Sequence, residues 1–378
     1  MDTTNLFCNN RACSKYGMIG QENIIRNGTS NGKIPQYGCK RCGHYFSMRT
    51  GTALFGLYMR ESVITSAMKA LAEGLSIRAT GRIFDRDKDT VALWLNRVGP
   101  HCERVMNHLL KDLPLRECQL DELWTFIYKK EGNLDFLELL AREYGDAWVW
   151  VCFEARLKVI PAFIVGKRTQ ENANELIRLV KERSDGRVPF FTSDELPHYA
   201  AALLEHYGVW HQPARKGMRG RFPKQIKVAP PQLQYAVVVK TRQQGRVVKV
   251  DRRIVFGSEP AINHLLERSP VSQTINTSYV ERDNLNLRQG SRRLTRKTNG
   301  FSKALQPLKN QLNLAIAYYH FVRPHDALKG ERASRLPTKG VHGSKQRWSA
   351  RTPAMVAGIT DHVWSMEELL NYRVPPIQ

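Results

Sequence analysis

Residues 115–130 read LRECQLDELWTFIYKK, and this stretch alternates apolar with polar side chains. Alternation together with aromatic residues favours a β-strand. Asp121 lies in the middle of the expected strand among apolar neighbours. A carboxylate in such a place needs a compensating cation or hydrogen bonds. The stretch therefore predicts a strand that carries a functional acid.

The segments that follow predict a mixed α/β domain. Two strand-like runs are followed by an amphipathic helix, a strand that ends directly before Asp194, a second helix and a short strand. They cover residues 147–154, 159–165, 170–184, 188–193, 196–208 and 209–212. A strand with an Asp, two more strands, a helix and a strand that ends in Asp follow the order of a ribonuclease-H-like fold. That fold would place Asp121 and Asp194 on adjacent strands.

A third carboxylate is expected from a later helix, and Glu281 is the best candidate. It lies in SYVERDNL, residues 278–285, at the head of a helix that we expect to continue through a series of basic residues: Arg288, Arg292, Arg293, Arg296 and Lys297. The arginines, Arg282 among them, would hold phosphates while Glu281 holds metal. A surface or capping acid is the simpler alternative, and Glu122, Glu195 and Asp283 are neighbouring candidates. Strand alternation points Glu122 away from Asp121.

Carboxylates suit phosphodiester chemistry because hard divalent cations prefer oxygen ligands. Two Mg²⁺ ions about 3.5–4 Å apart activate a water and stabilise the leaving oxygen. Asp121, Asp194 and Glu281 together would offset part of the charge of two Mg²⁺ or Mn²⁺ ions. The sequence thus predicts a two-metal site.

Four cysteines near the N-terminus form two close pairs, Cys8 with Cys13 and Cys39 with Cys42. Two such knuckles, separated by a loop, suit a tetrahedral zinc ion, and four protein ligands imply a structural role. A module of about 40 residues cannot bury a core unaided, so zinc would supply its folding energy. Four buried, inert thiols are the alternative.

Residues 60–112 are expected to be helical, with helix-turn-helix spacing. Ser76 can cap a helix at 77–84, and a third helix is expected at 90–98 with Val91, Trp94, Leu95 and Val98 on one face. In a major groove this helix would present four polar residues, namely Lys88, Thr90, Asn96 and Arg97. A packing bundle that links domains is the alternative.

The chain of 378 residues carries 58 Lys+Arg against 35 Asp+Glu, a net charge of +23. Residues 211–310 alone hold 21 basic and 5 acidic side chains, a net of 21 − 5 = +16. Such a surface concentrates polyanions, of which nucleic acid is the commonest. We find no signal-peptide pattern and no apolar run of about 18 residues, so we expect a cytoplasmic or nucleoid protein without a membrane partner.

These motifs together resemble the transposases of the insertion-sequence-one family and the wider DDE class. The similarity lies in YGCKRC at 37–42, LDELW at 120–124, TSD at 192–194, VERDNLNLR at 280–288, and RRLTRKT at 292–298 with FSK at 301–303, together with YYHFVRPH at 318–325 and RTPAM at 351–355. The resemblance implies Asp121, Asp194 and Glu281 as metal ligands. It also implies a zinc ribbon and a helix-turn-helix that recognise terminal inverted repeats.

The expected fold class is a multidomain α+β protein. We expect a zinc ribbon at 1–55, a helix-turn-helix at 56–112, a ribonuclease-H-like catalytic domain at 113–330 and a C-terminal tail at 331–378. The gap from Asp194 to Glu281 is 281 − 194 = 87 residues, longer than in compact family members. We therefore expect a β-rich insertion at about 213–275, with strands at 234–241 and 246–255 and a helix at 259–267.

The predicted function is divalent-metal-dependent cleavage at transposon ends, followed by attack of the freed 3′-OH on target DNA. The expected partner is double-stranded DNA, with at least a homodimer because two ends must be paired. Three alternatives are a ribonuclease-H-like nuclease or resolvase that cuts without joining, a catalytically dead DNA-binding regulator, and a basic RNA-binding protein. The intact set of acids argues against the last two.

Overall fold

The computed structural model describes residue 3 and residues 6–30, 34–141, 143–215, 222–337 and 345–376. The chain divides into two compact units. Unit 1 comprises residues 1–109, 310–318 and 364–378, and unit 2 comprises residues 110–309 and 319–363. The protein is thus a mixed α/β molecule of more than one part, as the sequence predicted.

Unit 2 is built on a six-stranded mixed sheet with the order β11-β10-β7-β4-β5-β6. β4 pairs parallel with β7, and β7 pairs parallel with β10, whereas the β4–β5, β5–β6 and β10–β11 pairs are antiparallel. The strands are β4 (Glu117–Ile127), β5 (Gly145–Glu154), β6 (Val159–Gly166), β7 (Phe190–Ser193), β10 (Tyr235–Gln243) and β11 (Arg246–Phe256). The predicted strand around Asp121 is confirmed as β4.

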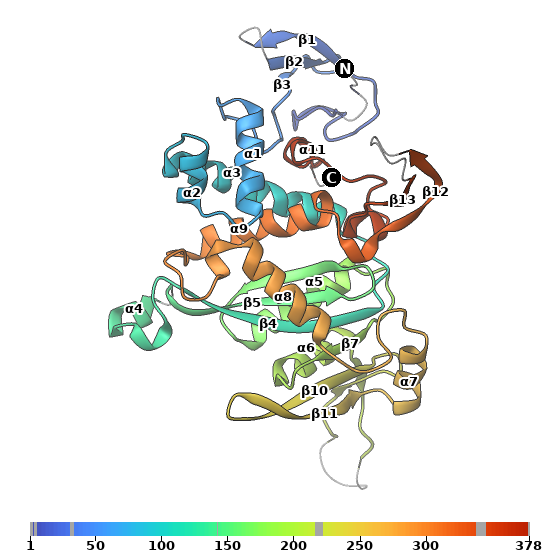
Figure 1. The fold of residues 1–378 in the computed structure, drawn as a ribbon. Helices are drawn as coiled ribbons and strands as arrows, with labels where there is room; N and C mark the ends of the chain where they lie inside the picture. The colour runs from blue at the N-terminus through green and yellow to red at the C-terminus, as the bar shows by residue number, and fades with distance from the viewer. Residues whose placement is uncertain are drawn as a thin grey trace. The chain divides into compact units, whose positions relative to one another are not determined.

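Helices cover both faces of this sheet. α8 (Ser278–Gly290) crosses one face over β4 and β5, while α5 (Gln170–Arg183) lies on the other (Figure 1). α6 (Pro197–Tyr207) packs beside α5. The strand interiors are apolar on both sides because both faces are covered, and the six residues of β5 from 149 to 154 are all buried.

The prediction of an insertion at about 213–275 is correct for its elements and wrong for their place in the fold. The β10–β11 hairpin and α7 (Glu259–Glu267) form as predicted. The hairpin is not a separate module, however, because β10 pairs parallel with β7 and so extends the central sheet. The burial of Tyr235, Ala236, Val237 and Val238 explains this placement, since these side chains belong to the core. Residues 216–221 of the expected insertion lie outside the described residues.

Smaller elements complete unit 2. A two-stranded sheet joins β8 and β9, and another joins β12 and β13. From residue 330, where the sequence predicted an irregular tail with one short helix at 365–372, the chain forms these latter strands and a short helix before that predicted one. The bounds are α4 (Phe136–Ala141), β8 (Val209–His211), β9 (Ile226–Val228), β12 (Gly330–Pro337), β13 (Lys345–Ser349) and α10 (Pro353–Val356), with 3-10 turns at Glu131–Asn133, Arg292–Leu294 and Asp326–Leu328.

Unit 1 combines a small sheet with a helical bundle. The sheet has the order β1-β2-β3, with β1 (Ile24–Ser30), β2 (Ile34–Cys39) and β3 (Tyr45–Ser47). The helices are α1 (Glu61–Ala72), α2 (Ile77–Ile83), α3 (Lys88–Leu109) and α11 (Met366–Asn371). The Ser76 cap is confirmed, since its hydroxyl accepts a hydrogen bond from the Ala79 N–H at 3.1 Å.

Helix α3 is longer than predicted, with 22 residues and Pro100 inside it. Its predicted buried face is confirmed, because Val91, Trp94, Leu95 and Val98 are all buried. Beyond that face, Gly99 lies against Asn310 of α9 (Leu305–Ala317), and a Cβ at Gly99 would stand 2.5 Å from the Asn310 Cα. This close packing against a distant segment keeps α3 helical past residue 98, which sequence alone did not indicate.

Among the described residues, no helix is both long and apolar enough to cross a membrane.

Candidate metal centre

Asp121 lies in the central strand of the sheet and is only partly exposed. Its Oδ1 accepts a hydrogen bond from the Glu122 N–H at 2.8 Å, and its Oδ2 accepts one from the Asn284 amide at 2.8 Å. Asn284 belongs to α8. The predicted need for a hydrogen-bonding partner is met by this helix.

Asp194 follows directly after β7, the parallel neighbour of β4. Leu120 pairs with Ser193, so the next residue of each strand is an aspartate. The Asp194 Oδ1 accepts a hydrogen bond from the Leu196 N–H at 3.2 Å. The pairing of these two adjacent parallel strands therefore places Asp121 and Asp194 side by side.

Glu122 joins these two aspartates. Asp121, Glu122 and Asp194 each offer a carboxylate oxygen, and these atoms all lie within 4.8 Å of one another. Alternation along β4 does send the two neighbours to different partners, since Glu122 accepts a hydrogen bond from the Tyr199 hydroxyl of α6 at 2.9 Å and forms an ion pair with Arg168. These partners agree with the expected alternation, and the distances show that Glu122, named from the sequence only as a neighbouring candidate, still has a carboxylate oxygen within reach of both aspartates.

Burial raises the pKa of all three acids. Burial, together with the charges of Glu122, Asp194 and Glu281, raises the pKa of Asp121 to about 7. Burial is also the main reason why the pKa values of Asp194 and Glu122 are raised, and the Arg168 guanidinium lowers both in part. Three carboxylates so placed repel one another, and a divalent cation would relieve that repulsion. This group can hold a divalent metal.

Glu281 lies outside this carboxylate group. It is in the first turn of α8, where its Oε1 accepts hydrogen bonds from the Thr277 hydroxyl at 2.5 Å and from the Lys240 ammonium. Its charge still acts on Asp121 and Asp194. Asn284, one turn later, is the α8 residue that contacts Asp121. Sequence reasoning missed Asn284, Lys240 and Arg168. The first could have been found from its position one helical turn after Glu281.

The basic residues after Glu281 do not share one helix. α8 ends at Gly290, and residues Arg292, Arg293, Arg296 and Lys297 lie in the turn and loop beyond it. The expected continuous helix is wrong because Gly290 and Ser291 interrupt it. Arg293 donates to the Ser302 hydroxyl at 3.1 Å, and Arg288 to the Trp124 carbonyl at 3.4 Å. Arg282, Arg292, Arg296 and Lys297 are exposed.

The four N-terminal cysteines converge in unit 1. Their sulfur atoms all lie within 4.8 Å of one another, with 3.6 Å between the Sγ atoms of Cys8 and Cys42 and 3.9 Å between those of Cys13 and Cys39. Sulfurs bound about 2.3 Å from a tetrahedral zinc are roughly 3.8 Å apart, so the cluster can hold zinc.

The surroundings of the second cysteine pair, Cys39 and Cys42, favour the deprotonated form of Cys39. The Asn23 amide donates to the Cys39 Sγ at 3.1 Å, and Gly43 adopts the positive φ of +71° that the turn requires. Burial raises the pKa of Cys39, but the N–H groups of Cys42 and Arg41 outweigh it and leave the pKa at about 7. A zinc ligand must be deprotonated, so this environment supports the metal.

The expected recognition residues of α3 do not form one face. At 100° per residue, Thr90 and Arg97 lie on the same side, whereas Lys88 is about 180° from Arg97. Lys88 forms an ion pair with Asp89 at 3.0 Å, and the side-chain Oδ1 of Asn96 accepts a hydrogen bond from the Asn310 side-chain amide at 3.0 Å. Arg97 stays exposed, which leaves it as the best placed of the four for an external ligand.

Comparisons with known proteins are sparse. No family model and no curated protein matches the chain. One solved structure, the Mos1 transposase paired-end complex with left transposon end, aligns over 38% of this chain at 12% identity and a TM-score of 0.16. The alignment covers 56% of that chain, little more than half its length. At this score it does not establish a shared fold.

Proposed function

We propose that this protein is a DDE-type DNA transposase that cuts at transposon ends and joins the freed 3′-OH to target DNA. The observation that carries the proposal is the pair Asp121 and Asp194, on adjacent parallel strands and with carboxylate oxygens within 4.8 Å. This is the arrangement that two-metal phosphodiester chemistry needs. The resemblance of the same segments to the insertion-sequence-one family supports it.

We assign the ribonuclease-H-like fold to unit 2 as part of the proposal. The central parallel pair β4 and β7, the antiparallel β5 and β6 and the covering helix α8 support the assignment. Within this fold Asp121, Asp194 and Glu281 are the proposed ligands of two Mg²⁺ or Mn²⁺ ions. Glu122 is the competing third ligand because it already lies in the group.

The chain's own residues would prepare the reaction in three ways. Asn284 holds the Asp121 Oδ2, which fixes that carboxylate for binding. Arg168 and Tyr199 hold Glu122 beside the same edge. Lys240 and Thr277 hold the carboxylate of Glu281, the proposed third ligand. Bound divalent ions would supply an activated water and stabilise the oxygen that leaves phosphorus.

DNA binding is proposed for the remaining features. The net charge of +23 supports a polyanionic partner. A structural zinc on the four thiols would stabilise the N-terminal sheet, and α2 and α3 would recognise terminal inverted repeats. Because two ends must be joined in one event, we propose at least a dimer on DNA.

A strand-transfer assay tests the function. The full chain is incubated with Mg²⁺, labelled DNA that flanks its gene, and a target plasmid. We expect labelled ends covalently joined to the plasmid, and no product with Asp194→Asn although that variant still binds the ends. Hydrolysis without joining would replace the transposase with a nuclease, and equal activity of Asp194→Asn would overturn the site.

A further inference from the structure

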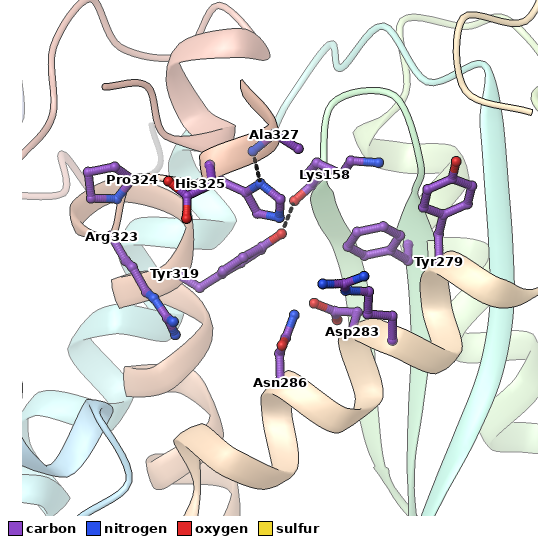
Figure 2. A pocket seen from close by; sticks show the side chains of 12 residues that line it. Lys158, Tyr279, Asp283, Asn286, Tyr319, Arg323, Pro324, His325 and Ala327 are labelled. Carbon is purple, nitrogen blue, oxygen red and sulfur yellow. Dashed lines mark hydrogen bonds between the residues drawn. The ribbon is translucent and has the colours of Figure 1, made fainter. Parts of the chain in front are cut away.

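Unit 2 contains a cavity of about 420 Å³ that the proposed function does not use. It lies between α8, the turn after β5 and the segment at 319–327 (Figure 2). Its volume falls in the range of ligand pockets, roughly 300–1,000 Å³.

Helix α8 links this cavity to the metal centre. Tyr279, Asp283 and Asn286 line the cavity at the i, i+4 and i+7 spacing that places residues on one side of a helix. Asn284, which binds Asp121, projects about 100° from Asp283. A DNA strand at the carboxylates would therefore run beside the helix that forms the cavity wall.

Asp283 is the unusual member of the lining. It is only 3% exposed, and its Oδ2 has no hydrogen-bond partner. Its carboxylate points into the space between α8 and the 319–327 segment (Figure 2). A buried acceptor without a donor is destabilising, and more so when it is charged, so this carboxylate is suited to a ligand that brings donors.

The charges around Asp283 restrict the ligand. Lys158, Arg282 and Arg323 also line the cavity, and its second acid, Asp326, is paired with Lys329 at 2.8 Å. A purely cationic ligand would meet three cations, and a purely anionic one would leave Asp283 uncompensated. The lining fits a ligand with neutral donors at one end and a negative charge at the other.

The remaining groups favour a flat aromatic ligand. The Tyr319 hydroxyl donates to the Lys158 carbonyl at 2.7 Å, which fixes a ring that faces the cavity (Figure 2). His325 accepts the Ala327 N–H on Nδ1 at 3.2 Å, so in the neutral ring Nε2 carries the proton and can donate. Aromatic faces of this kind stack on nucleobases.

We propose that this cavity binds one guanine nucleotide unit, with its base edge on Asp283 and its phosphate near Arg282 and Arg323. Guanine offers two adjacent donors, N1–H and the N2 amine, which match one carboxylate. The expected source is an unpaired guanine in the DNA strand at the metal centre, and this part rests on the proposed function. A free guanine nucleotide would present the same chemistry.

Fluorescence anisotropy without added Mg²⁺ tests the proposal on the full chain. Two labelled duplexes differ only in one unpaired base, which is guanine or hypoxanthine. A fully paired duplex is the control, and free dGMP and dIMP are tested as alternative ligands. We expect the unpaired guanine to bind about tenfold more tightly than hypoxanthine, which lacks the N2 amine. Asp283→Asn, nearly the same in size, should lose that preference.

Tyr319 provides a matched pair of variants. Tyr319→Phe keeps the ring and should retain the preference for guanine, whereas Tyr319→Leu should weaken binding of both unpaired bases about tenfold. Equal affinity of the wild type for all duplexes, without binding of dGMP, would overturn the proposal. Binding of dGMP without preference among the duplexes would support the guanine site and overturn its DNA source.

Strand transfer by the same preparation separates this inference from the proposed function. If joining persists while the guanine preference is absent, only the inference fails. If guanine is preferred while no cleavage or joining occurs with Mg²⁺, the proposed function fails.

Discussion

Three acids of the candidate metal centre lie so close together that their charged forms are destabilised unless a cation is bound. Asp121, Glu122 and Asp194 share one small volume, and burial raises the pKa of each. Arg168 compensates part of this charge from one side. We propose that a bound metal ion compensates the remaining negative charge.

Asp121→Asn should stabilise the metal-free protein at pH 8. The folded-state pKa of about 7 lies above the ordinary 3.8, so the folded state holds the proton more tightly and loses stability as pH rises from about 4 through 7. Asparagine cannot ionise, which removes a cost of at most ~4 kcal/mol. We expect a melting temperature several degrees higher at pH 8 and no gain near pH 4.

Differential scanning calorimetry in the absence of Mg²⁺ measures this effect. Added Mg²⁺ should reverse it by stabilising the wild type alone. A variant that is less stable than the wild type at pH 8 without Mg²⁺ would mean that Asp121 is well compensated by the protein itself.

Glu281→Gln should reduce Mg²⁺-dependent cleavage by about 100-fold or more, since the proposed third carboxylate ligand is lost. Glu195→Gln is the matched control, because Glu195 pairs with Arg253 at 2.8 Å outside the carboxylate group. Cleavage rates of the two variants and of Glu122→Gln, measured together, decide the third ligand. Full activity of Glu281→Gln with loss in Glu122→Gln would transfer the role to Glu122.

Among the helices and strands, the sequence predicted those features that depend on residues close together in the chain. The strand around Asp121, the Ser76 cap and the β10–β11 hairpin follow from alternation, capping and turn chemistry. The length of α3 and the place of the hairpin were missed because they depend on distant partners, Asn310 against Gly99 and β7 against β10.

The same distinction holds for the candidate site. Order along the chain indicated Asp121, in the middle of the first strand, and Asp194, directly after a later strand. Glu122 was named only as an alternative, and Asn284, Lys240 and Arg168 were missed, because the spacing of residues along the chain does not show how far side chains reach toward neighbouring elements. The helix after Glu281 was expected to continue through Arg292 to Lys297, but it ends at Gly290.

Zinc should hold the N-terminal sheet together. Its buried cluster is small and includes three of the thiols: Leu6, Cys8, Cys13, Ile24, Tyr37, Cys39 and Phe46. We expect elemental analysis to find one zinc per chain. In Cys39→Ser we expect the zinc to be lost, and β1 and β2 to lose their protection from hydrogen exchange. Cys102→Ala, outside the cluster, is the control that should keep the metal. Unchanged exchange after zinc removal would leave the four thiols as ordinary core residues.

At the scale of the whole molecule, charge should govern affinity for DNA. Each neutralised phosphate contributes about −0.9 to the slope of log affinity against log salt. Arg292 and Arg296 are exposed, so replacing both with Gln should reduce the magnitude of that slope by about 2. Lys329→Gln is the control, because Lys329 is paired with Asp326. An unchanged slope in the double variant would exclude phosphate contacts there.

Anomalous X-ray diffraction from crystals grown with Mn²⁺ would show whether Asp121 and Asp194 bind one metal together. We expect an anomalous peak about 2.1 Å from a carboxylate oxygen of each aspartate. We expect this peak to be absent in Asp194→Asn. A peak that touches neither aspartate, or an undiminished peak in Asp194→Asn, would show that the two aspartates do not share a metal.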